Sequence, residues 1–264
     1  MDAGFAAATA TNALLESGPH EEVASFDTDA LLDQRSRRPV LRIDHGVMGT
    51  LTWPELRLYA ITADLDRSLL VLAGPEPDFR WHEWTAEVVD LGSRLGVELV
   101  LGVGAFPAPV PHTRPVRLAA TASSEELAGK VGFLPATIDV PAGAQAVLEV
   151  AFAKAGTPSI GVWARVPHYA AGTPYPEAAA TLLDQVSSLT GAHIDTAALH
   201  EAGRRSRDQI QALIEASDEH TAMVRQLEEQ YDAELGMSAT EFTNLPTGDE
   251  LAAELEKYLR GEGR

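Results

Sequence analysis

Short apolar runs bounded by glycine and proline alternate with segments of helical spacing through most of this chain. Runs of that length and flanking predict buried strands. The continuous apolar run 69–73 predicts a central strand, whereas alternation over 56–61 predicts a half-buried one. Apolar residues three and four apart over 79–95 predict a helix, and a strand over 97–103 follows at once. This strand–helix–strand order indicates a parallel crossover.

The same patterns predict elements on both sides of that unit. Asp44-His45-Gly46 separates two apolar runs and predicts a tight hairpin turn. Ser123-Ser124-Glu125-Glu126 predicts the capped start of a short helix. We expect further helices over 6–15, 143–155 and 176–189, and further strands over 22–26, 40–43, 47–53, 116–122 and 159–164.

The pattern changes after residue 192. From 196 to 264 there is no strand pattern, and the segment holds 15 acidic and 7 basic residues. A helical seam runs through it, and Thr247-Gly248-Asp249-Glu250 predicts a last helix ending near residue 260. We therefore expect an α/β core domain over 1–195 and an acidic helical extension over 196–264.

Composition narrows the class of protein. A hydrophobic fraction of 45% in 264 residues supports a packed core. A net charge of −19 argues against nucleic acid or an anionic membrane as partner. The chain has no cysteine, which excludes disulfides and thiolate chemistry, and it shows no bilayer-length apolar run or signal peptide. We expect a cytoplasmic globular protein.

Standard catalytic motifs are largely missing. The sequence has no G-x-S-x-G elbow and no Walker A loop, and Gly102-Val103-Gly104 lacks the third glycine of a dinucleotide fingerprint. The segment His82-Glu83-Trp84-Thr85-Ala86 starts like a zinc-binding helix, but Ala86 stands where a second histidine would be needed. We therefore expect no catalytic residue, no metal and no cofactor, and consider an enzyme less favoured than a binding protein.

Candidate chemistry gathers in three proline-flanked turns that each follow an apolar run. Ligands in open α/β sheets bind beyond the carboxyl ends of the strands. Three such turns therefore predict one shared binding site. Its candidate residues are Glu76, Arg80, His112, Thr113, Arg114, His168 and Tyr169.

Each turn also has a purely structural interpretation. Prolines at 111 and 115 stiffen the loop between them. The loop can therefore present an imidazole and a guanidinium that lose little conformational entropy on binding. Alternatively, Arg114 ties that loop to a neighbouring carboxylate or carbonyl. Glu76 and Arg80 are four apart, which favours a local ion pair. His168 and Tyr169 are typical of an aromatic pair at an interface or core edge.

Three motifs together resemble the proteasome assembly chaperone 2 family in its actinobacterial form. They are Gly74-x-Glu76-Pro77-x-x-Arg80-Trp81, Pro111-His112-Thr113-Arg114-Pro115-Val116 and Trp163-x-x-Val166-Pro167-His168-Tyr169. The resemblance covers about residues 2–260. It implies a three-layer α/β/α sandwich of the phosphorylase/hydrolase-like type with a helical C-terminal extension. It also implies a chaperone-like or scaffolding role, a homo-oligomer, and a protein partner such as a 20S proteasome subunit.

Two departures from the family pattern qualify these expectations. Family members usually open with an apolar strand leading into Gly-Trp-Asn-Asp-Ala-Gly, whereas Met1-Asp2-Ala3-Gly4 stands at the end of that motif. The resemblance thus implies that the first strand is missing, through truncation or a misassigned start. The ending Glu262-Gly263-Arg264 lacks the hydrophobic-Tyr-x tail of similar archaeal proteasome activators. An alternative hypothesis is a binder or enzyme for a nucleoside or anionic ligand, with His112 as acid or base.

Overall fold

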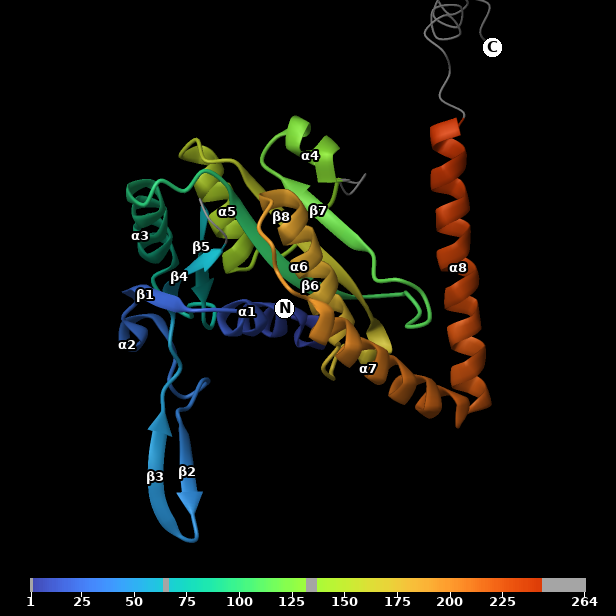
Figure 1. Ribbon diagram of the computed structural model, residues 1–264, viewed down its shortest axis with the longest axis horizontal. Coiled ribbons are helices and arrows are strands. Elements are labelled where there is room, and N and C mark those ends of the chain that lie inside the picture. The colour runs from blue at the N-terminus through green and yellow to red at the C-terminus, as the bar shows by residue number, and fades with distance from the viewer. Residues whose placement is uncertain (1, 64–66, 132–136, 244–264) are drawn as a thin grey trace, which may run out of the picture. The chain divides into compact units, whose positions relative to one another are not determined.

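The computed structural model describes residues 2–63, 67–131 and 137–243 (Figure 1). The chain forms two compact units, Met1–Ala212 and Leu213–Arg264. Helix α7 (Ala197–Glu215) crosses from the first unit into the second. The last helix expected, over 247–260, lies outside the described residues.

The first unit contains a three-stranded sheet in the order β6-β8-β7. Strands β6 (Val100–Ala108) and β8 (Ser159–Pro167) are parallel and paired along their whole length, ending at Ala108 opposite Pro167. Strand β7 (Leu118–Ala122) is antiparallel to β8. Because β6 and β8 end in register, the segments that follow them emerge at one edge of the sheet.

A second three-stranded sheet has the order β1-β4-β5 and is antiparallel. Its strands are β1 (His20–Ser25), β4 (Arg57–Ala63) and β5 (Arg67–Ala73). The prediction of a central strand at 69–73 was wrong, because β5 lies at the edge of this sheet and β4 lies in the middle. The predicted crossover was also wrong, since β5 and β6 belong to different sheets. A continuous apolar run reports burial on the faces of a strand and does not specify its hydrogen-bonded neighbours.

Helices cover both faces of the β6–β8 pair. On one face, Val162, Ala164 and Val166 of β8 pack in a core with residues of α1 (Ala6–Glu16) and α6 (Pro176–Thr190). On the other face lies α5 (Ala144–Lys154), which packs with α3 (Trp81–Arg94) through a core that includes Trp84, Leu148 and Phe152. The expected α/β/α sandwich is confirmed. The short elements are η1 (Ala3–Phe5), α2 (Thr28–Leu31), α4 (Glu125–Val131) and η2 (His168–Ala170).

Glycines let α5 approach the sheet closely. A Cβ atom on Gly102 would lie 2.2 Å from Oε1 of Glu149, and one on Gly161 would lie 2.7 Å from both carboxylate oxygens of Glu149. Gln145 and Thr121 donate hydrogen bonds to this carboxylate at 2.9 and 3.4 Å. Burial raises the pKa of the Glu149 carboxyl, and these two bonds oppose that rise. The glycines therefore make room for a buried acid between helix and sheet.

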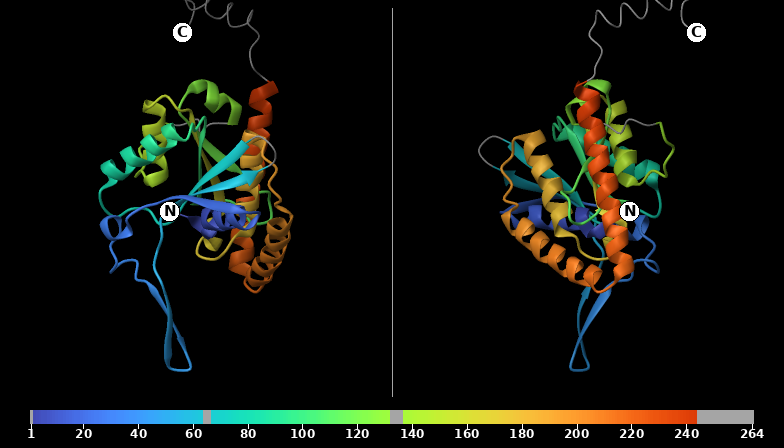
Figure 2. Two further views of the ribbon diagram at one scale, coloured as in Figure 1. Left: turned by 60° about the vertical axis from the view of Figure 1, so that its left-hand side comes forward. Right: turned by 90° about the vertical axis from the view of Figure 1, so that its right-hand side faces the viewer.

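Strands β2 (Val40–Asp44) and β3 (Val47–Thr52) form a hairpin that projects from the rest of the first unit (Figures 1 and 2). The predicted turn is confirmed: His45 and Gly46 have φ of 46° and 84°, the pair of positive values that a tight hairpin turn of this type requires. Every residue of both strands is exposed. The hairpin consequently owes little of its stability to packing within the described chain.

The second unit is helical where it is described. Helix α8 (Asp218–Thr243) follows α7, and the Thr221 hydroxyl donates to the carbonyl of Ile214 at 3.2 Å across the turn between them. Among the described residues, no helix is long and apolar enough to span a bilayer.

Candidate functional site

Two of the three predicted turns meet at the carboxyl edge of the β6–β8 pair. The loop after β6 carries His112, Thr113 and Arg114, and η2 after β8 carries His168 and Tyr169. The rings of His112 and Tyr169 pack edge to face, with centroids 5.8 Å apart at 90°. The in-register ends of two parallel strands explain this meeting.

His112 is fully buried and joined to two other elements by hydrogen bonds. Its backbone N–H donates to the Tyr169 hydroxyl at 2.8 Å, and its Nδ1 lies 2.8 Å from the same oxygen. Its Nε2 lies 2.9 Å from Oε1 of Gln211 in α7. A neutral imidazole satisfies this network when the tyrosine donates to Nδ1 and Nε2–H donates to Gln211.

This geometry gives His112 a structural task. Its ring nitrogens face partners inside the protein, and no part of it is exposed. A general acid or base must reach the proton it transfers on a substrate. The arrangement therefore supports His112 as the link between the β6 loop, η2 and α7, and gives less support to the alternative of His112 as a catalytic acid or base.

The exposed part of this edge lies on the other side of Tyr169. His168 is exposed, and its ring packs edge to face against Tyr169 with centroids 5.3 Å apart. Tyr169 is half-buried and so lies between a buried and an exposed histidine. Thr113 and Arg114 are half-buried on the adjoining loop. At this edge of the sheet, His168 is therefore the exposed member of the predicted set.

Glu76 and Arg80 serve other elements. The Glu76 carboxylate accepts the backbone N–H of Ala144 at 3.1 Å, at the first turn of α5, where the helix dipole favours a negative charge. Arg80 forms a bidentate ion pair with Glu83, in which Nε and Nη2 donate to the two carboxylate oxygens at 2.7 and 2.6 Å. The expected Glu76–Arg80 ion pair was therefore wrong, because each side chain has a different partner. None of these contacts links the third turn to His112 or Tyr169.

Sequence reasoning missed Gln211, Asp2 and a histidine contact between α6 and α7. Asp2 accepts the N–H groups of Ala7 and Ala8 at 2.8 and 3.0 Å and so caps α1. A capping carboxylate ahead of a helix is a readable signal. The Gln211 contact had no such signal, since 99 residues separate it from His112.

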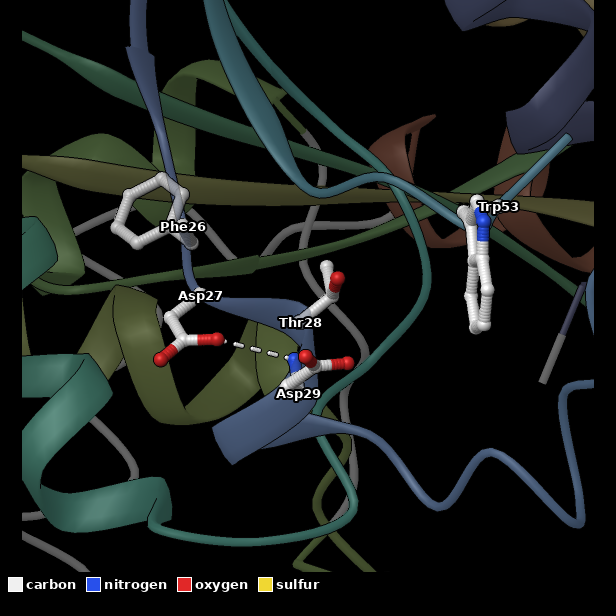
Figure 3. A pocket seen from close by; sticks show the side chains of 5 residues that line it. All are labelled: Phe26, Asp27, Thr28, Asp29 and Trp53. Atoms are coloured by element: carbon white, nitrogen blue, oxygen red, sulfur yellow. Dashed lines mark hydrogen bonds between the residues drawn. The ribbon is translucent and has the colours of Figure 1, made fainter.

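A shallow pocket lies elsewhere in the first unit, at the base of the hairpin (Figure 3). It is lined by Phe26, Asp27, Thr28, Asp29 and Trp53. The Asp27 carboxylate already accepts the N–H of Asp29 at 3.0 Å as the cap of α2. None of the predicted site residues lines this pocket. Within the described ranges, no group of three or more histidine, aspartate and glutamate side chains is placed to hold a metal ion.

Comparison with solved structures finds close neighbours among actinobacterial proteins. A Mycobacterium tuberculosis protein of unknown function, Rv2714, is 38% identical with a TM-score of 0.85, over 91% of this chain and 82% of its own. A Corynebacterium glutamicum protein of unknown function is 34% identical with a TM-score of 0.84, over 89% of this chain and 87% of its own. The M. tuberculosis proteasome-assembly chaperone homologue Rv2125 is 31% identical with a TM-score of 0.78, over 84% of this chain and 95% of its own.

No curated protein matches the chain. A family model does match it, over residues 1–214, which include the α/β/α sandwich and both turns at its carboxyl edge. The match and the actinobacterial neighbours agree with the motifs around Glu76, His112 and His168. The chain belongs to the PAC2 family.

Proposed function

We propose that this chain is a cytoplasmic, self-associating protein with a chaperone-like or scaffolding role, and that a 20S proteasome subunit is its partner. The proteasome part is supported by the likeness to Rv2125, a proteasome-assembly chaperone homologue. The self-association part is carried by one observation on the chain itself, the uncovered apolar face of the β2–β3 hairpin.

That face is built from two cross-strand pairs. Leu41 pairs with Leu51 and Ile43 pairs with Met48, so these four side chains lie on the same face of the hairpin. Ile43 is 63% exposed and Met48 is 77% exposed. The opposite face carries Arg42, the pair Asp44 and Val47, and the pair Val40 and Thr52. One face of the hairpin is therefore entirely aliphatic and the other is mixed, and nothing in the described chain covers the aliphatic face.

A two-stranded hairpin alone is marginally stable in water, and an apolar face needs packing to stabilise it. Burying one such aliphatic side chain contributes about 1.5–3 kcal/mol. A second copy of the chain offers the same face for a symmetric contact, in which each buried side chain counts twice. Arg42 on the opposite face also suits an acidic partner, and the chain carries a net charge of −19.

Charged substitutions on the two faces test the self-association. Met48→Glu places a charge on the aliphatic face and is expected to reduce the oligomer to monomers in sedimentation velocity. Val47→Glu is the matched control, since Val47 is 69% exposed on the opposite face. We expect it to leave the mass unchanged. Monomeric wild-type protein at tens of micromolar, or equal masses for all three proteins, would refute the self-association.

The partner is tested separately, with purified proteins. The wild-type chain is mixed with 20S proteasome α subunits from the same organism, and the species present are resolved by native mass spectrometry. We expect a mixed complex with the wild-type chain. Detection of the chain alone, with intact α subunits in the same spectrum, would refute the proteasome part and leave the self-association standing.

A further inference from the structure

His200 of α7 lies between two carboxylates of α6. Its Nδ1 is 3.2 Å from Oε1 of Glu177, and its Nε2 is 2.9 Å from Oδ2 of Asp184. Glu177 and Asp184 are seven residues apart, two helical turns along one face of α6. One imidazole therefore bridges two turns of α6 and holds the start of α7 against that helix.

The geometry of this bridge defines its protonation state. A carboxylate only accepts hydrogen bonds, so each ring nitrogen must carry a hydrogen to bond its partner. A neutral imidazole has one N–H and can satisfy one of the two carboxylates. His112 is the contrasting case, because a hydroxyl that can donate lies beside its Nδ1. Both bonds of His200 form when the ring is an imidazolium.

Neighbouring groups complete the charge balance around His200. The Arg207 guanidinium lies 3.9 Å from Oε2 of Glu177, and the Thr196 hydroxyl donates to Oδ1 of Asp184 at 2.7 Å. Gly203 permits the close approach of the helices, since a Cβ there would lie 2.3 Å from Oε2 of Glu177. On the exposed side of α7, Arg204 and Arg205 pair with Glu201. Two carboxylates thus face one imidazolium and one more distant guanidinium.

We propose that His200 is a proton-dependent latch that fastens α7 to α6 in its charged form and loosens when the ring loses its proton. The same helix carries Gln211, the partner of His112. A loosened α7 therefore weakens the link between α7 and the loop at the carboxyl edge of the sheet. The latch depends on contacts within the first unit and does not rest on the proposed proteasome role.

The direction of the pH effect follows from the electrostatics. Burial lowers the pKa of His200, but the hydrogen bond to Asp184 and the charges of Glu177 and Asp184 outweigh it, and the net pKa is raised above 6.5. A raised histidine pKa gives stability that is fully present below pH 6.5 and is lost as the pH rises through the folded-state value. The latch is therefore closed in mild acid and opens toward alkaline pH.

Hydrogen–deuterium exchange of peptides from 197–211 measures the latch between pH 5.5 and 9, after correction for intrinsic exchange rates. We expect protection in the wild-type chain to fall about three- to tenfold as the pH rises. His200→Gln removes the charge and is expected to give low protection at every pH. His200→Arg keeps a permanent charge and is expected to keep high protection at every pH. His82→Gln, at an exposed histidine on α3, is the matched control and should behave as wild type.

A second measurement guards against a variant that fails to fold. NMR titration of the wild-type chain follows the His200 ring directly and is expected to show an imidazolium at pH 6.5 with deprotonation above it. A neutral ring at pH 6 would overturn the proposal. It would also be overturned if wild type and His200→Gln lost protection in parallel, or if His200→Arg followed the wild-type curve.

Discussion

Hydrogen-bond partners distinguish the roles of His112 and His200. His112 has a hydroxyl and an amide as partners, and these suit a neutral ring. His200 has two carboxylates and a side chain that is 32% exposed, and these suit a charged ring. His200 attaches the start of α7 to α6, and His112 attaches α7 further along through Gln211. Residue chemistry therefore distinguishes the two attachments of α7, one to two carboxylates and one to a buried imidazole.

Removing a single oxygen tests the His112 network. Tyr169→Phe deletes the hydroxyl that serves both the backbone N–H and Nδ1 of His112. Leaving buried polar groups without that partner costs about 1–3 kcal/mol, and we expect a loss of that size in urea unfolding. Tyr59→Phe in β4 is the control, expected within about 0.5 kcal/mol of wild type. Equal stability of the two variants would contradict the structural task assigned to His112.

Elements are positioned largely by side chains that lie far away along the chain. Glu76 follows β5 yet caps α5, 68 residues later. Asp78, two residues on, accepts the N–H of Asp33 at 2.8 Å and pairs with Arg37. The pKa of Asp78 is lowered, chiefly by its hydrogen bond from Arg37. The turn after β5 thus ties α5 and the segment after α2 together, a structural function of one predicted binding motif.

Glu76→Ala tests this element-level task. The substitution removes a carboxylate from the N-terminus of α5, and we expect a loss of about 0.5–2 kcal/mol in the free energy of unfolding. Glu83→Ala removes an exposed ion pair with Arg80 and an acidic side chain from the first turn of α3, and is expected to cost less than about 1 kcal/mol. Partner binding should be unchanged in Glu76→Ala. A stable Glu76→Ala variant that loses its partner would instead return Glu76 to the binding site.

The elements that the sequence predicts well are those with local causes. Helical spacing predicts α1, α3, α5 and α6, and the turn residues His45 and Gly46 predict the hairpin. Strand pairing could not be predicted in this way, because the apolar run of β5 does not specify which strand lies beside it. The rule for the ends of parallel strands predicts that His112 lies near Tyr169. The sequence does not predict the contact with Gln211 or the partners of Glu76, because these join residues far apart along the chain.

At the scale of the whole molecule, the chain combines a packed α/β/α sandwich with an arm that packs on nothing in the described chain. The sandwich places a helix layer on each face of a sheet, and the family match covers it. The hairpin instead exposes Ile43, Met48 and Leu51 to solvent. A contiguous apolar face of this kind marks an interaction surface. In the proposed self-association, a second copy of the chain supplies the cover that this face needs.

Hydrogen exchange of the hairpin amides at several protein concentrations tests the proposed self-association. An uncovered two-stranded hairpin exchanges close to the rate of an unfolded peptide, whereas a covered one is protected. We predict that protection over residues 40–52 rises at least tenfold from nanomolar to tens of micromolar wild-type protein, as a second copy covers the aliphatic face. Exchange over 40–52 that stays fast and independent of concentration would contradict self-association through this face.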